Sequence, residues 1–61
     1  MSWIAMKQGR WNMLKTQLEN ASIWTDKGDI ERRMRELESE AAEMAFGKSA
    51  SDIRREWEAA S

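Results

Sequence analysis

Three carboxylates in the middle of the chain have the spacing of a metal-binding helix face. Glu36, Glu40 and Glu43 stand at positions i, i+4 and i+7, so a helix would present them on one side. The di-iron bundles that use such carboxylates also need histidine in a Glu-x-x-His motif, and the chain has no histidine. Cysteine and tyrosine are absent too, which leaves only Ser, Lys and carboxylates as bases or nucleophiles. We therefore interpret the three glutamates as a solvated acidic face and expect no catalytic residue, no metal site and no cofactor.

A second group of residues with a recognisable spacing begins at Gly47. A serine stands two positions after this glycine, and apolar residues, Ile53 and Trp57, stand six and ten positions after it. This spacing resembles the turn and recognition helix of helix-turn-helix repressors. The resemblance implies a DNA-binding regulator that uses residues 47–57, with four side chains facing the major groove: Ser51, Asp52, Arg54 and Arg55.

Two positions depart from the helix-turn-helix pattern. Glu43 stands four residues before the glycine, where the family has a small residue, and Lys48 replaces the apolar residue that normally fills the turn. Residues 47–61 also carry three basic and three acidic side chains, which gives little attraction for phosphate. DNA binding is therefore the alternative function.

Residue usage and punctuation predict an all-α chain. Proline is absent, and good helix formers such as Ala, Glu, Arg, Met and Leu dominate the sequence. Gly28 lies in a predicted tight turn, and Gly47 marks a helix stop, after which Ser49 is the N-cap of a last helix. We expect helices at about 3–25, 30–46 and 50–59, in one small domain spanning residues 1–61.

Heptad spacing predicts that the first two helices form an antiparallel hairpin. Apolar positions step by three and four residues along both segments, and a fold at Gly28 would bring Trp11 level with Met44. Charge favours the same arrangement, because residues 1–28 have a balance of +2 and residues 29–46 a balance of −3. The predicted seam comprises Trp11, Leu14, Leu18, Ala21 and Thr25 with Ile30, Met34, Leu37, Ala41 and Met44.

Several apolar residues lie outside this seam. Met6, Met13 and Trp24 form a stripe on the flank of the first helix, and Ile53 and Trp57 form the apolar face of the third. The third helix could fold back onto the stripe, or two hairpins could pair through their stripes into a helical bundle. A chain of 61 residues without cysteine gains extra burial most simply by self-association, so we favour the homodimer.

Four tryptophans and five methionines in so short a chain favour a protein-binding role, because both residue types are enriched where proteins meet. The sequence has no long apolar run and no secretion signal, so we expect a cytoplasmic protein without a membrane partner. We predict a non-catalytic binding module, such as a small inhibitor, adaptor or anti-activator, that contacts a larger protein through a helix face. The candidate contact residues are Trp3, Met6, Met13, Ile23 and Trp24.

Overall fold

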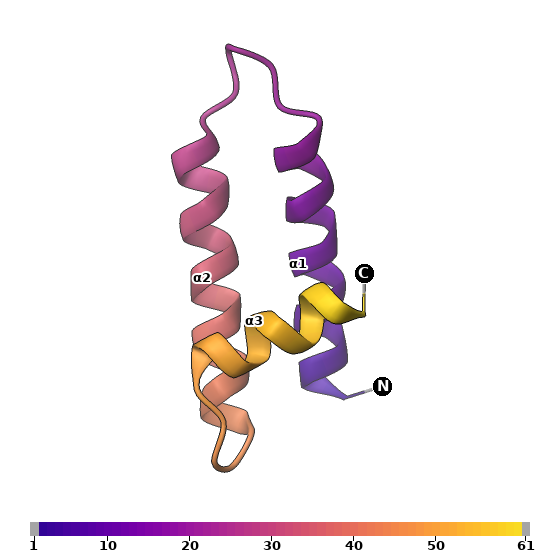
Figure 1. The fold of residues 1–61 in the computed structure, drawn as a ribbon, viewed down its shortest axis with the longest axis vertical. Helices are drawn as coiled ribbons and strands as arrows, with labels where there is room; N and C mark the ends of the chain where they lie inside the picture. Colours follow the sequence, from indigo (N-terminus) through magenta and orange to yellow (C-terminus); the bar gives the residue numbers. More distant parts are fainter. Residues whose placement is uncertain (1, 61) are drawn as a thin grey trace.

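The computed structural model describes residues 2–60, which form three helices and no strand. The helices are α1 (Trp3–Glu19), α2 (Lys27–Met44) and α3 (Ala50–Ala59). α1 and α2 run antiparallel, and α3 lies across them near the end of the hairpin that carries the N-terminus (Figure 1). The prediction of an all-α helical hairpin with a short third helix is confirmed.

The first helix was predicted to end at about position 25. The observed helix, α1, ends earlier, at Glu19. Asn20 caps the helix: its backbone N–H and its side-chain amide both donate to the Thr16 carbonyl oxygen, and the next backbone N–H, that of Ala21, donates to the Leu18 carbonyl. An asparagine that binds the helix carbonyls in this way competes with continuation of the helix. The chain therefore reverses in a loop at residues 20–26.

Polar side chains hold this loop. The Thr25 hydroxyl accepts the Ser22 backbone N–H at 3.1 Å, and the Ser22 hydroxyl accepts the Trp24 backbone N–H at 3.2 Å. Asp26 then caps α2 by accepting a backbone N–H of the first turn, so Gly28 lies within that turn and not at the reversal.

The predicted bounds of the second helix, about 30 and 46, were each wrong by a few residues, because α2 begins at Lys27 and ends at Met44. Two predicted seam residues lie in the loop: Ala21 and Thr25.

The earlier reversal shifts α1 against α2 by roughly one helical turn from the predicted register. Trp11 does not lie level with Met44; its indole Nε1–H donates to the Glu38 carboxylate at 2.8 Å. Lys7 forms an ion pair with Glu40 across the same two helices. Met44 is consequently 47% exposed, whereas Glu38 is buried. The buried positions of α2 are Ile30, Met34, Glu38 and Ala41.

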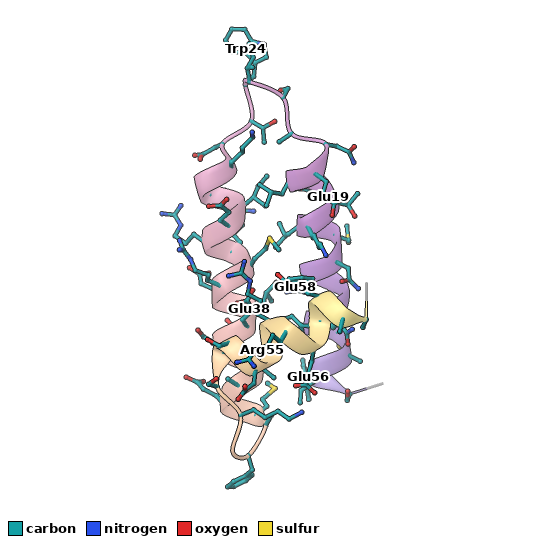
Figure 2. All side chains as sticks on the ribbon, in the orientation of Figure 1. Glu19, Trp24, Glu38, Arg55, Glu56 and Glu58 are labelled. Atoms are coloured by element: carbon teal, nitrogen blue, oxygen red, sulfur yellow. The ribbon has the colours of Figure 1, made fainter. Side chains whose placement is uncertain are left out.

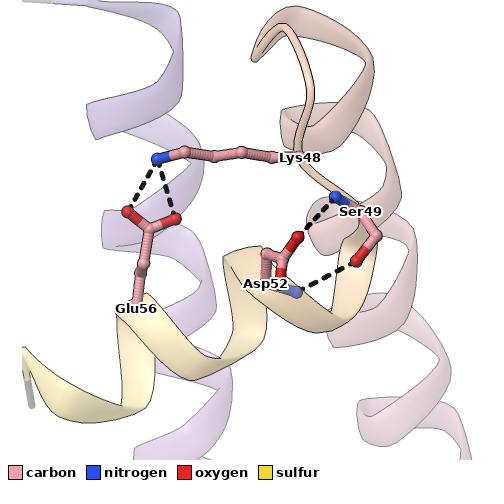
Figure 3. A network of polar contacts seen from close by, with 4 residues as sticks. All are labelled: Lys48, Ser49, Asp52 and Glu56. Carbon is pink, nitrogen blue, oxygen red and sulfur yellow. Dashed lines mark hydrogen bonds and ion pairs between the residues drawn. The ribbon is translucent and has the colours of Figure 1, made fainter.

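α3 has the predicted bounds because strong local signals define its start. Gly47 has a φ of +77°, the left-handed conformation that glycine adopts most readily after a helix. The Ser49 hydroxyl accepts the Asp52 backbone N–H at 3.3 Å, and the Asp52 carboxylate accepts the Ser49 backbone N–H at 3.1 Å (Figure 3). These hydrogen bonds hold the pKa of Asp52 below its ordinary value. Lys48 contacts both carboxylate oxygens of Glu56, at 2.7 and 2.9 Å (Figure 3).

Trp11 lies where the three helices meet. It is 1% exposed, and its ring centroid lies 5.7 Å from that of Trp57, with the two rings tilted by 58°. The Lys15 ammonium lies 5.4 Å from the Trp11 ring centroid, a cation–π distance. Trp11, predicted in the seam, and Trp57, predicted on the apolar face of the third helix, are thus both buried in the core. The buried apolar core consists of Trp11, Ile30, Met34, Ala41, Ile53 and Trp57.

α3 does not cover the flank stripe. Its buried residues, Ile53 and Trp57, join the cluster around Trp11 on the other side of α1. The arrangement in which the third helix folds onto the stripe is therefore wrong. The stripe stays open in the single chain: Met6, Met13 and Trp24.

Candidate functional site

The five predicted contact residues are all exposed, but they lie on two separate surfaces. Ile23 and Trp24 occupy the loop between α1 and α2, and we call this pair the tip. Trp3, Met6 and Met13 lie along the outer side of α1. A longer first helix would have joined the five residues into one continuous patch. Because α1 ends before the tip, they form two surfaces within residues 2–60.

The tip presents two large apolar side chains to solvent. Ile23 is 90% exposed and Trp24 is 88% exposed, and Figure 2 shows Trp24 projecting away from both helices at the end of the hairpin. The backbone beneath them is fixed by the hydrogen bonds between Ser22 and Thr25, so the loop holds the pair outward. An exposed aromatic residue on an ordered loop can enter an apolar pocket at a small entropic cost.

A hollow of about 380 Å³ lies between α1 and α2. Leu14 and Leu37 are half-buried in it, with Met13 beside them. α3 packs on the cluster around Trp11 through Ile53 and Trp57, near Ile4 of α1 and Ala45 just after α2, and no residue of α3 lines the hollow. The hollow is therefore open to solvent on the side that α3 does not cover. Its polar rim consists of Arg10, Gln17, Arg33, Glu36 and Glu40.

A second hollow, of about 340 Å³, lies where α1, α2 and α3 approach one another. Trp11, Leu18 and Met34 contribute apolar surface, and the rest of the lining is charged with both signs. Arg54 is already paired with Glu58 at 3.0 Å, and the Glu38 carboxylate is occupied by the Trp11 indole. Figure 2 shows Glu19, Glu38 and Glu58 on this side of the molecule. The lining carries three basic and four acidic side chains, so its charges nearly balance.

The predicted acidic face on α2 is exposed. Glu36, Glu40 and Glu43 are all solvent-accessible, and Glu40 pairs with Lys7. Within residues 2–60, no three acidic side chains are placed to share a metal ion.

The residues that the helix-turn-helix resemblance assigns to DNA lie on α3, where carboxylates of the same helix already contact them. Arg54 pairs with Glu58, and the hydrogen bond between them raises the pKa of the guanidinium. Arg55 lies 3.7 Å from the Asp52 carboxylate, which also caps the helix. Ser51 is exposed beside them. The structure thus brings the four residues together at the start of α3, with both arginines in intrahelical ion pairs.

Three surface features of the molecule differ from the predictions or lie outside them. Met44 was placed in the seam, and Phe46, which is fully exposed after α2, was not considered. Leu37 was expected in the middle of the seam; it packs against the core, as predicted, but only in part, because its other side borders the open hollow. Heptad spacing could not reveal this, because the same spacing placed both Leu37 and Met44 in the predicted seam.

Comparisons of the chain with known protein families, with curated proteins and with solved structures find no match. No helix within residues 2–60 has the length and apolar character needed to cross a bilayer.

Proposed function

We propose that this chain is a non-catalytic protein-binding module that contacts a larger protein through its tip. The observation that carries the proposal is the adjacent pair Ile23 and Trp24, each about nine-tenths exposed at the end of a hairpin. Tryptophan is the residue type most enriched among those that dominate binding energy. The role as an inhibitor, adaptor or anti-activator in the cytoplasm, acting as a homodimer, is part of the same proposal.

The tip can supply substantial binding energy. A tryptophan buries about 200 Å² on entering a pocket, which corresponds to about 5 kcal/mol of gross hydrophobic free energy. Ile23 adds to this area because it is the neighbouring residue and is equally exposed. The hydrogen bonds of Ser22 and Thr25 order the loop in advance, so less free energy is lost on binding.

Charge near the tip favours a protein pocket over a lipid surface. The charged residues nearest the loop that form no ion pair within residues 2–60 are two acids and one lysine: Glu19, Asp26 and Lys27. Asp29, further along α2, is already paired with Arg32 and Arg33. An anionic membrane would repel this surface, whereas a pocket with basic residues at its rim would attract it. We therefore propose a protein partner with an apolar pocket and a basic rim.

Replacing Ile23 and Trp24 together by serine is expected to abolish binding while leaving the fold intact, because both side chains make no core contact. Capture from an extract of the host, with immobilised parent and variant chains, should show proteins retained by the parent and lost from the variant. The affinity for such a protein should fall at least about tenfold, the equivalent of 1.4 kcal/mol.

Phe46→Ser is the matched control, since it removes another fully exposed apolar side chain at the opposite end of the hairpin. The control should capture the same proteins as the parent. Equal capture by the tip variant and the parent would reject the tip as the contact surface.

DNA binding through residues 47–57 is the second candidate, and one observation favours it. Gly47 has the left-handed φ that the turn of a helix-turn-helix requires, and α3 follows directly. The ion pairs of Arg54 and Arg55 weigh against it, because a phosphate would have to replace a carboxylate already in place. A salt-sensitive gel shift that is lost in the Arg54→Ala, Arg55→Ala variant would distinguish this function from tip-mediated protein binding.

A further inference from the structure

The hairpin carries a second, unused seam on the side away from α3. On α1 the residues at positions 3, 6, 10, 13 and 17 step by three and four, and on α2 the residues at positions 33, 37, 40 and 44 do the same. Helices that use two such stripes are typical of four-helix bundles, in which each helix packs against two neighbours. We call the apolar members of these stripes the open face: Trp3, Met6, Met13, Leu37 and Met44.

The two stripes are level with each other. Met13 and Leu37 line the same hollow, so they lie at one height along the hairpin. Met6 is one heptad before Met13, and Met44 is one heptad after Leu37. Because the helices are antiparallel, Met6 and Met44 both lie roughly 10 Å beyond Met13 and Leu37, toward the same end of the hairpin. The open face therefore has two apolar levels, one formed by Met13 and Leu37 and the other by Met6 and Met44.

Unpaired charges of opposite sign border this face. Arg10 lies on its α1 side, and Glu36 and Glu43 lie on its α2 side. None of the three forms an ion pair with another residue in the 2–60 range. Glu40, between the two glutamates, is held by Lys7 of the same chain. Arg33, on the α2 side as well, is paired with Asp29 of the same helix. The unpaired charges are thus basic on the α1 edge and acidic on the α2 edge, which makes the face complementary to itself.

We infer that a second copy of this chain covers the open face, with α1 of each copy packed on α2 of the other. A two-fold axis parallel to the helices produces this pairing and makes every neighbouring pair of helices antiparallel. It brings Arg10 of one copy against the unpaired glutamates of the other. The alternative axis, perpendicular to the helices, would place α1 on α1 and α2 on α2. Arg10 would then face a basic edge, and Glu36 would face an acidic one, which is unfavourable.

The orientation has a consequence for the tip. An axis parallel to the helices keeps both hairpin loops at the same end of the bundle, so the dimer presents Ile23 and Trp24 twice on one surface. Two linked contacts bind with higher avidity than one when the partner offers two sites. Self-association itself does not depend on the proposed function of the tip, because the open face and the tip share no residue.

Light scattering is expected to give a mass twice the 7.1 kDa of one chain at micromolar concentration. Met13→Glu should raise the dissociation constant at least about tenfold, since it places a carboxylate in the apolar interface. Met13 is 65% exposed in the single chain, so the variant should keep its helical circular dichroism. Asn12→Glu adds the same charge at an exposed neighbouring position off the face and should leave the dimer intact. A monomeric parent, or a dimer unaffected by Met13→Glu, would overturn the inference.

Spin labels distinguish the two axes. The chain lacks cysteine, so Lys27→Cys labels one site per copy at the tip end of α2. With both tips at one end, the two labels should lie within about 30 Å, because helices at diagonal corners of a bundle are close. With the tips at opposite ends, their separation would approach the 38 Å length of the molecule. A distance distribution centred at that larger value would overturn the proposed orientation.

A charge exchange tests the complementarity directly. Arg10→Glu should weaken the dimer, and the double variant Arg10→Glu, Glu36→Arg should restore it, because the opposite charges still meet across the interface. The tip variant with serine at positions 23 and 24 should remain dimeric. Loss of partner capture with an intact dimer would then separate a failure at the tip from a failure of self-association. If the double variant dimerises as weakly as the Arg10→Glu variant, this pairing of helices is rejected.

Discussion

Replacing Trp11 by alanine is expected to lower the free energy of unfolding by about 3–5 kcal/mol. Trp11 is 1% exposed, contacts Trp57 and gives its indole N–H to Glu38. The variant would leave both a cavity and a buried carboxylate without its donor, which adds to the cost. Because domains of this size are rarely more stable than about 3–5 kcal/mol, Trp11→Ala should be largely unfolded in urea titrations followed by circular dichroism.

Trp11→Phe separates the ring from the hydrogen bond. Phenylalanine keeps an aromatic ring in contact with Trp57 but removes the donor to Glu38, for an expected loss of about 1–3 kcal/mol. Adding Glu38→Leu to Trp11→Phe should recover part of that loss, since both polar partners are then gone. A Trp11→Ala variant with the parent's unfolding midpoint would show that the helices do not meet at this residue.

Trp57→Ala is expected to release α3 from the hairpin. Trp57 and Ile53 are the only buried residues of this helix within the described chain, so the loss of Trp57 removes most of its apolar contact. The expected cost is again about 3–5 kcal/mol, measured as the loss of hydrogen-exchange protection in the backbone amides of α3.

Trp24→Ala is the matched control for that experiment. It truncates the same type of residue in the exposed tip and should change the free energy of unfolding by no more than about 0.5 kcal/mol. Retained protection of α3 in Trp57→Ala would contradict the packing of this helix on the Trp11 cluster.

The limits of α3 could be predicted from the sequence because their causes are local. Gly47 and the reciprocal pair Ser49 and Asp52 lie within six residues and fix the start of the helix without help from distant contacts. The end of α1 has no glycine or proline to mark it. It depends on hydrogen bonds from Asn20 and on the Ser22 to Thr25 turn, and those side chains are also tolerated inside helices.

The register of α1 against α2 could not be predicted from heptad spacing alone. Slipping one helix by about a turn preserves the spacing of three and four, so several registers bring apolar residues together. The structure favours the register in which α3 covers Trp11 and Glu38 accepts the indole N–H. A buried tryptophan needs such an acceptor, and Glu38 lies four residues after Met34 and three before Ala41, on the buried side of α2.

The candidate site was predicted in part. The five expected contact residues are exposed, as a free apolar surface requires, but their binding role remains a prediction. Their division between tip and open face follows from the end of α1 at Glu19, six residues before the predicted end at about 25. The early end of α1 also shifts the register of the two helices. In this register no residue of α1 covers Met44, so Met44 becomes part of the open face.

Solvent exchange of the indole N–H groups tests the central claim most directly: Trp11 closes the core, and Trp24 is left outside as a contact residue. Each of the four tryptophans gives one indole signal in a proton–nitrogen NMR spectrum. We expect the Trp11 signal to exchange slowly, because its N–H is buried and bonded to Glu38, and the Trp24 signal to exchange as fast as a free indole. Rapid exchange at Trp11, or protection of Trp24 in the isolated chain, would contradict this account.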